Sequence, residues 1–237
     1  MRSVNRTEKP QILIDNEQIW TTELLMTLNK MSEKIPLKDQ DRREQINFQC
    51  VVSKVSSTIS TRYSHDSIRL ALQKMYEKRC CYCEGKISAQ TYDHIEHLCP
   101  KSLFPHLTFE WENLHCCCEV CNKKKGDKWD QLFPILDPTK DCLEQYLDLD
   151  LNNGKIINLT RDKRAQNTIE HTQLNRADLV EERKAIIQKY HLIFKRATNL
   201  NQLELAKQYI EFEMMYSSYP TLHQKILGEI EKAIHEG

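Results

Sequence analysis

The chain has few glycines and prolines, no excess charge of either sign and no long hydrophobic run. Five glycines and seven prolines among 237 residues, with abundant Leu, Ile, Lys, Glu and Gln, favour helices over strands. The formal net charge is zero. Bulk positive charge is therefore excluded as a means of coating nucleic acid, and any such contact needs a local patch or a partner.

The sequence is not expected to carry a targeting segment. Residues 1–18 are polar and charged, without the apolar core of a secretory signal, and no stretch approaches 18 consecutive apolar residues. We therefore expect a cytoplasmic protein without a membrane span. In such a reducing compartment, clustered cysteines indicate metal or redox chemistry more often than disulfides.

The residue pattern divides the chain into three regions. Residues 1–78 are expected to be helical, because apolar residues recur there at helical spacing. Residues 79–137 are dense in Cys, His and aromatic residues and contain short runs compatible with strands. Residues 138–237 begin with a predicted hairpin at 150–159, where Asn153-Gly154 suits a type I′ turn, and continue as amphipathic helices.

The ten cysteines gather mainly in two tight clusters. Two Cys-x-x-Cys pairs supply the candidate zinc ligands, Cys80, Cys83, Cys118 and Cys121. Four thiolates at this spacing can close a tetrahedral zinc site and staple the 34 residues between the pairs (84–117) into one unit. A thioredoxin-type redox site explains one such pair but not two. The neighbouring thiols of Cys81, Cys116 and Cys117 leave the choice of ligands open.

Two acid-histidine dipeptides, Asp93-His94 and Glu96-His97, lie between the cysteine pairs. An extended strand directs residues two apart to the same face, so His94 and His97 cannot both point at one site. Imidazole accepts a proton near neutral pH, which makes one of these histidines a candidate general base. A single histidine in such a run is otherwise more often structural than catalytic.

Asn122 directly follows the second cysteine pair and begins a basic run that ends at Lys125-Gly126. Its side-chain carbonyl is a hard oxygen ligand suited to Mg²⁺. The same residues are equally typical of a helix cap followed by a solvated basic turn, and this alternative stays open at the level of the residues alone.

Together these segments resemble the HNH, or ββα-metal, nuclease family. That family's pattern is an acid-His dipeptide with Pro three residues after the His, then Asn-Leu, then Cys-x-x-Cys followed by Asn, and then Lys. The matching residues here, in order, are Glu96-His97 with Pro100, Asn113-Leu114, Cys118 to Asn122, and Lys125-Gly126. The position of the proline selects Glu96-His97 over Asp93-His94.

A narrower resemblance covers most of the chain. The sequence is similar to HNH nucleases of bacterial antiphage operons of the Septu type, including those attached to retrons. The similarity is carried by CCYCEGKI, IEHLCPKS, FEWENL, CNKKKGD, FPILDP and, at 168–176, TIEHTQLNR. It implies a mainly α chain with a small zinc-stapled ββα-metal (HNH) module, which is an α+β fold. It also implies partnership with an ABC/SMC-like ATPase subunit and, in retron systems, with a reverse transcriptase and its msDNA.

The resemblance implies catalytic roles for particular residues. His97 would be the general base, and Asn113 would brace the loop that orients it. Glu96 and Asn122 would hold one Mg²⁺ or Mn²⁺ ion. The implied activity is metal-dependent endonucleolytic hydrolysis of phosphodiester bonds in antiphage defence.

Two lysines and the cysteines complete the expected site. Lys101 and Lys125 are candidate phosphate contacts, although both are equally typical of surface lysines. Structural Zn²⁺ at Cys80, Cys83, Cys118 and Cys121 would supply rigidity without chemistry, because four thiolates leave no open position.

Two other functions fit parts of the pattern. An RNase effector that cuts host RNA such as tRNA is one, because DNA and RNA share the phosphates that such a site grips. A non-catalytic zinc-ribbon adaptor is the other, since the cysteine pairs alone would suffice for it. The motif leaves DNA and RNA targets, the activation trigger and the stoichiometry with a partner open.

Overall fold

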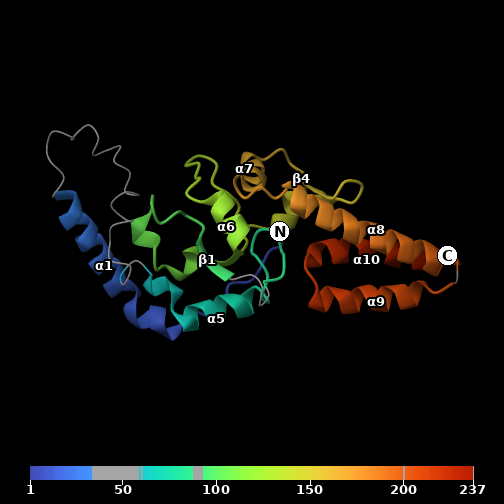
Figure 1. Cartoon of the computed structure of the whole chain (residues 1–237), viewed down its shortest axis with the longest axis horizontal. Coiled ribbons are helices and arrows are strands. Elements are labelled where there is room, and N and C mark those ends of the chain that lie inside the picture. The colour runs from blue at the N-terminus through green and yellow to red at the C-terminus, as the bar shows by residue number, and fades with distance from the viewer. Residues whose placement is uncertain (34–58, 60, 88–92, 200, 237) are drawn as a thin grey trace.

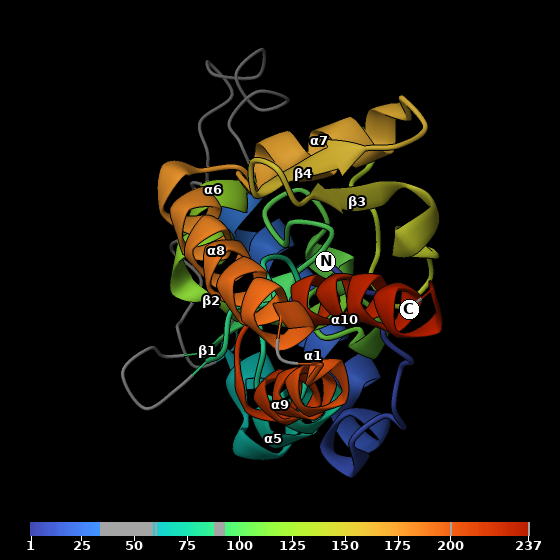
Figure 2. The same cartoon turned by 90° about the vertical axis from the view of Figure 1, so that its right-hand side faces the viewer.

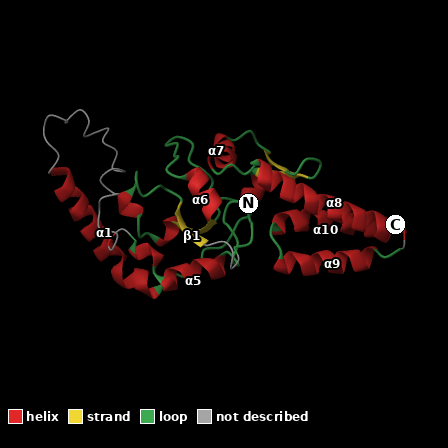
Figure 3. Cartoon of the chain, in the orientation of Figure 1, coloured by secondary structure: helices red, strands yellow, loops and turns green. Residues whose placement is uncertain are grey.

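The fold is described from a computed structural model of the chain, which covers residues 1–33, 59, 61–87, 93–199 and 201–236 (Figure 1). The α-helices in these residues are α1 (Gln11–Glu33), α5 (Asp66–Met75), α6 (Glu119–Lys125), α7 (Lys163–His171), α8 (Ala177–Asn199), α9 (Leu203–Tyr216) and α10 (Pro220–Glu236). The strands are β1 (Asp93–His97), β2 (Leu114–Cys118), β3 (Leu147–Asp150) and β4 (Lys155–Asn158). Helices dominate and the two sheets are small and antiparallel, which confirms the α+β class (Figure 3).

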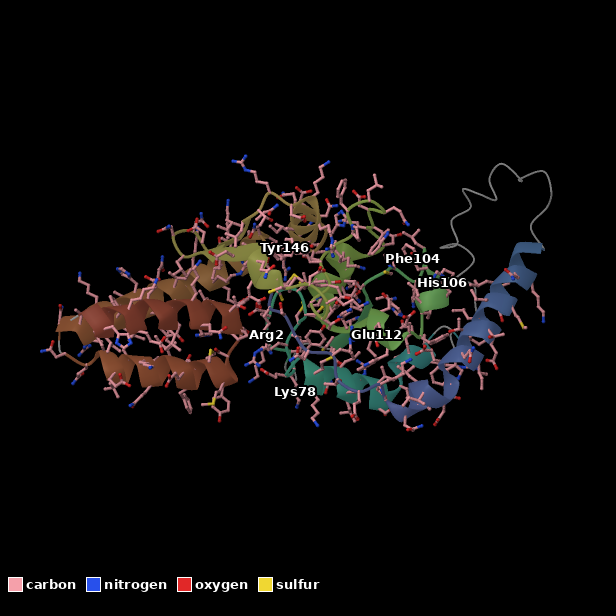
Figure 4. The ribbon with its side chains drawn as sticks, turned by 180° about the vertical axis from the view of Figure 1, so that it is seen from behind. Arg2, Lys78, Phe104, His106, Glu112 and Tyr146 are labelled. Atoms are coloured by element: carbon pink, nitrogen blue, oxygen red, sulfur yellow. The ribbon has the colours of Figure 1, made fainter. Side chains whose placement is uncertain are left out.

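The elements form a central unit with an extension on each side. β1, β2 and α6 lie in the middle, α1 and α5 lie on one side, and α8, α9 and α10 form an elongated arm on the other (Figures 1 and 2). The ring of Trp20 in α1 packs edge-on against Phe109 of the central unit, with centroids 5.6 Å apart. Phe104 and His106 lie on the side of this unit that is nearer to α1 (Figure 4).

The central unit has the order strand, strand, helix. β1 pairs with β2 in an antiparallel register that places Glu96 opposite His115 and His97 opposite Leu114. α6 follows β2 directly, with the Cys118 thiol accepting from the amide of Cys121 as a helix cap. The helix ends at Lys125 and is followed by Gly126, whose φ of 52° is a positive value that glycine adopts without steric cost. This order agrees with a ββα module, and membership of the HNH class stays a prediction.

An extended segment at the start of the chain contacts the central unit. The guanidinium of Arg6 donates to the carbonyl oxygens of Leu114 (2.7 Å) and Glu112 (2.9 Å). Trp111, which is 1% exposed, donates its indole N–H to the carbonyl of Thr7 at 3.0 Å. Contacts of this kind cross the predicted boundary at residue 78. The three-part division at 1–78, 79–137 and 138–237 stays a prediction.

The predicted hairpin is confirmed, but its turn differs from the expected type I′. Asp150 pairs with Lys155, so residues 151–154 form a four-residue loop and not a two-residue one. The side chain of Asp150 accepts the amide N–H of Asn152 at 2.8 Å, and its carbonyl accepts the amide N–H of Gly154 at 2.8 Å. This local side-chain bond competes with the tighter turn and lengthens the loop.

The arm and the remaining helices do not resemble membrane spans. None of the helices in the described part of the chain is both long and apolar enough to cross a bilayer.

Two glycines are expected to respond in opposite directions to alanine. Gly154 has a φ of 70°, and an added Cβ would lie 3.0 Å from the carbonyl oxygen of Val180. Gly154→Ala should therefore lower the free energy of unfolding by about 1–3 kcal/mol. Gly228 lies within α10 with open space around its missing Cβ, so Gly228→Ala should raise that free energy by up to about 1 kcal/mol. Guanidinium denaturation of both variants measures the two signs, and a Gly154→Ala protein as stable as wild type would contradict the packing described.

Candidate functional site

Four thiols converge where the loop after α5 meets β2 and α6. The sulfur atoms of Cys80, Cys83, Cys118 and Cys121 all lie within 4.8 Å of one another. The Sγ atoms of Cys83 and Cys118 are 3.9 Å apart. Tetrahedral zinc with Zn–S bonds of about 2.3 Å separates its sulfurs by about 3.8 Å, so the cluster is compatible with one zinc ion.

Two further thiols lie beside this cluster. Cys81 and Cys117 form a second close group with Cys80, and the Sγ atoms of Cys80 and Cys117 are 3.6 Å apart. Cys116 belongs to neither of the metal-sized groups found in the described residues. A hydrogen bond from Cys117 lowers the pKa of the Cys118 thiol to about 4, whereas burial raises the pKa of Cys81. The thiolate needed for metal binding is therefore favoured at Cys118 over Cys81.

Arg176 provides positive charge next to the thiols. Its Nη1 donates to the sulfur of Cys121 at 3.2 Å, from the turn between α7 and α8. Burial alone would lower the pKa of this guanidinium, but the Cys121 sulfur outweighs that effect and raises it. Sequence reasoning singled out the string that ends in Arg176 without assigning it a contact. The contact could not be read from local spacing, because Cys121 lies 55 residues from Arg176 in the sequence.

His97 is held in one orientation at the end of β1. Its ring is 7% exposed, and its Nε2 lies 2.9 Å from the carbonyl oxygen of Thr108. A carbonyl oxygen only accepts, so Nε2 carries the hydrogen and the lone pair of the neutral ring lies on Nδ1. Burial, reinforced by the charge of Lys101, lowers the pKa of His97 to about 3. His97 is therefore neutral at physiological pH.

Asn113 braces the loop that contacts His97. Its Oδ1 accepts the amide N–H of Cys99 at 2.7 Å, and its Nδ2 donates to the carbonyls of Cys99 and Leu107, each at 3.1 Å. Leu107 immediately precedes Thr108, whose carbonyl meets the histidine ring. The structure thus brings Asn113 and His97 together through the loop, as a residue that orients the imidazole would require.

Tyr63 lies against the same histidine and was not identified from the sequence. The two rings meet edge to face with centroids 4.5 Å apart. Lys101 donates from Nζ to the Tyr63 hydroxyl at 2.8 Å and is itself half-buried. Tyr63 lies in a short 3₁₀ turn (Arg62–Ser64) outside the motif region, so no local pattern marks it.

Glu96 and Lys125 form a buried ion pair. The Glu96 Oε1 is 2.5 Å from the Lys125 Nζ, and the two side chains are 3% and 0% exposed. The Lys125 ammonium also donates to the carbonyl of His97 at 2.8 Å. Burial raises the pKa of Glu96 to about 7 against the lowering influence of Lys125. The sequence suggested a phosphate contact for Lys125. In the structure its ammonium lies in the interior, between the Glu96 carboxylate and the carbonyl of His97.

Asn122 borders an open hollow, whereas Glu96 is buried. This hollow has a volume of about 620 Å³. It is also lined by Asp93 and His94, the other acid-histidine pair, and by Tyr63 and Arg69. Arg69 is tied to Asp93 by an ion pair of 3.0 Å. Within the described residues, Asn122 makes no side-chain hydrogen bond to Glu96. The oxygen donors are of the type that Mg²⁺ takes, and a cation site at Glu96 and Asn122 stays a prediction.

The chain is similar in sequence to known proteins over part of its length. A protein named Septu protein PtuB from Bacillus thuringiensis is 32% identical over 143 residues, which cover 56% of this chain and 53% of that protein. Another of the same name from Bacillus mycoides (strain KBAB4) is 24% identical over 181 residues, covering 64% of this chain and 60% of that protein. The matches thus span between half and two thirds of these curated relatives. No family model matches the chain.

The hydrogen bond from His97 to Thr108 predicts a fixed tautomer. Because the folded-state pKa is lowered to about 3, the ring should stay neutral with its proton on Nε2 from pH 8 down to about pH 4. An unfolded histidine takes up a proton near pH 6.5, so this burial makes folding less favourable as pH falls from about 6.5 towards 3. Long-range ¹H–¹⁵N NMR spectra report the two ring nitrogens directly. A proton on Nδ1, or titration of His97 near pH 6.5, would contradict the geometry.

Proposed function

We propose that the chain is an endonuclease of the HNH type that hydrolyses phosphodiester bonds in a Septu-type antiphage defence system. The observation that carries the proposal is the state of His97, a buried neutral imidazole held by Thr108 at the end of the first strand of a ββα unit. The likeness to two proteins named Septu protein PtuB supports the defence role.

His97 would act as the general base on water. With the proton of the neutral ring on Nε2, the Nδ1 lone pair can take a proton from water as the oxygen attacks phosphorus. The Thr108 carbonyl continues to accept from Nε2–H and stabilises the imidazolium that results. A phosphate bound nearby adds negative charge, which raises the pKa of the ring above its resting value and strengthens the base when substrate is present.

Two neighbours would position this chemistry. Asn113 fixes the backbone around Leu107 and thereby the direction of the Thr108 carbonyl. Lys101 uses one ammonium proton on the Tyr63 hydroxyl, which leaves two for a flanking phosphate oxygen. Of the two lysines considered, the half-exposed Lys101 is therefore the one that we propose as a phosphate contact.

The structure supports the two predicted metal sites to different degrees. The four thiols fit Zn²⁺, which we propose as a structural ion that joins the loop after α5 to β2 and α6. The Mg²⁺ or Mn²⁺ site at Glu96 and Asn122 stays a prediction, because Lys125 engages the Glu96 carboxylate. A requirement for added Mg²⁺ in cleavage assays would support this cation site.

We further propose that the chain works with other proteins of a defence operon. An ABC/SMC-like ATPase subunit is the partner that we propose, with a retron reverse transcriptase and its msDNA where such genes are present. A formal net charge of zero supports this view, because a nuclease without bulk positive charge gains from a partner that brings nucleic acid to it.

Replacement of His97 tests the catalytic proposal, and His94 offers a matched control three residues away. His97→Ala should lower the rate of cleavage about 100-fold or more, because proton transfer to a positioned base is lost. His94→Ala should retain cleavage, since His94 belongs to the acid-histidine pair that the position of Pro100 does not select. The protein and its operon partners would be incubated with plasmid and with total RNA, with and without Mg²⁺.

The pattern of cleavage decides among the functions considered. Loss of plasmid cleavage in His97→Ala alone supports the DNA endonuclease, and cleavage of RNA alone identifies the RNase alternative. Full phage protection and cleavage by a folded His97→Ala protein would exclude His97 as the base. Circular dichroism establishes that each variant is folded.

Removal of a single thiol tests the zinc site. Cys118→Ser should release the roughly one equivalent of zinc expected for a four-thiolate site and unfold the central unit, because metal binding and folding are coupled there. Cys99→Ser is the control, since Cys99 belongs to neither thiol group. Atomic absorption and thermal melting measure both effects. Equal zinc content in the two variants would contradict the proposed ligands.

A further inference from the structure

The solvent side of α9 is apolar along the length of the helix. Five large apolar side chains recur there at helical spacing and are between 39% and 61% exposed, namely Leu205, Tyr209, Phe212, Met215 and Tyr216. The opposite side of α9 is buried in the arm through Ala206 and Ile210. α9 runs along the lower edge of the arm in the view of Figure 1, and its last turn contacts the loop after α5, where Arg79 donates to the carbonyls of Met214 and Met215. We call the five residues the α9 face.

An exposed face of this kind is unusual for an isolated chain. Together the five side chains leave roughly 500 Å² of apolar surface in water, near the upper end of the 300–600 Å² that the largest patch of a monomer covers. Aromatic residues and methionine are also the types enriched at protein interfaces. The helix already packs into the arm on its other side, so the α9 face is free to bind a further protein surface.

We propose that the α9 face binds the α9 face of a second copy of the chain, in an antiparallel arrangement with two-fold symmetry. Such symmetry requires that residue i of one copy meets residue j of the other and that j meets i. The spacing satisfies this requirement. Leu205 would lie opposite Tyr216 of the other copy and Tyr209 opposite Phe212, so that these four apolar side chains meet apolar ones on both sides of the axis, while Met215 lies at the edge of the contact.

Charges beside the α9 face are compatible with this pairing. Glu213 is held within its own chain by Lys189 at 3.1 Å, and Lys207 is held by Glu231 of α10 at 3.0 Å. In the same register Glu204 would lie opposite Ser217, so these acidic side chains do not meet their copies. The pairing therefore brings apolar surfaces together, with Glu211 as the acidic side chain that would lie beside the two-fold axis.

A groove next to the α9 face extends the surface that a second copy can cover. It lies between α8 and α9, has a volume of about 460 Å³, and shares Leu205 and Tyr209 with the α9 face. Ile193 and Ala197 of α8 line its other wall. A stable interface takes about 800 Å² from each partner, which the α9 face together with this groove and the flanking polar residues can supply.

Sedimentation velocity of the full chain tests the proposal. Wild-type protein should shift from monomer to dimer as its concentration rises between about 1 and 100 µM. Phe212→Glu should raise the dissociation constant roughly 100-fold or more, because the buried charge enters a two-fold interface twice. Leu132→Glu is the matched control, since Leu132 is 81% exposed and lies outside α9. It should dimerise as wild type does.

A photo-crosslinking phenylalanine analogue at Tyr216 tests the orientation. Mass spectrometry should find it joined to a peptide containing Leu205 of the other copy. A wild-type chain that stays monomeric at all concentrations overturns the proposal and assigns the α9 face to a different protein. A dimer that persists in Phe212→Glu, or a crosslink from Tyr216 to the Tyr216 region of the other copy, overturns the antiparallel α9 pairing. Because Phe212 is 57% exposed, the variant should keep the wild-type melting curve.

Discussion

Four sulfur atoms drawn from two distant segments lie within 4.8 Å of one another, and the geometry of the central unit depends on their meeting. Cys80 and Cys83 anchor the loop that follows α5, while Cys118 and Cys121 anchor the junction of β2 with α6. With β2 fixed, the antiparallel register fixes β1 as well, and with it the end of the strand at His97. A unit this small has little apolar core of its own, so a metal ion held by these thiols would supply rigidity that packing alone does not.

The interior of this unit holds two polar arrangements with different physical roles. His97 is buried as a neutral group, so its burial costs little Coulomb energy and its single hydrogen bond to Thr108 fixes its tautomer. Glu96 and Lys125 are buried as charges, and desolvation offsets much of their attraction. Their pairing joins α6 to β1 in one orientation, which is a gain in specificity of packing more than in stability. The first arrangement fixes the Nδ1 lone pair of His97 that the proposed chemistry would use, and the second holds the strand that carries this residue.

The sequence predicted those features that depend on local spacing. Two Cys-x-x-Cys pairs indicated the thiol cluster, periodicity indicated the helices, and Asn153-Gly154 marked the hairpin. Features that depend on tertiary contact were missed or placed differently. Lys125 looks like a surface residue in a basic run, and only the packing of α6 on β1 makes it an interior one. Tyr63 and Arg176 reach the site from outside the motif, and the Asp150 side chain lengthened the predicted turn through a bond that turn statistics do not include.

Two arginines remote in sequence complete the central unit. Arg6 satisfies the carbonyls of Glu112 and Leu114, and Arg176 satisfies the sulfur of Cys121. A chimera that grafted residues 79–137 alone onto another scaffold would leave these acceptors without their hydrogen-bond donors. Recombination that exchanges this cassette between homologues is therefore productive only when the incoming partner sequences bring their own guanidinium groups to the same two places.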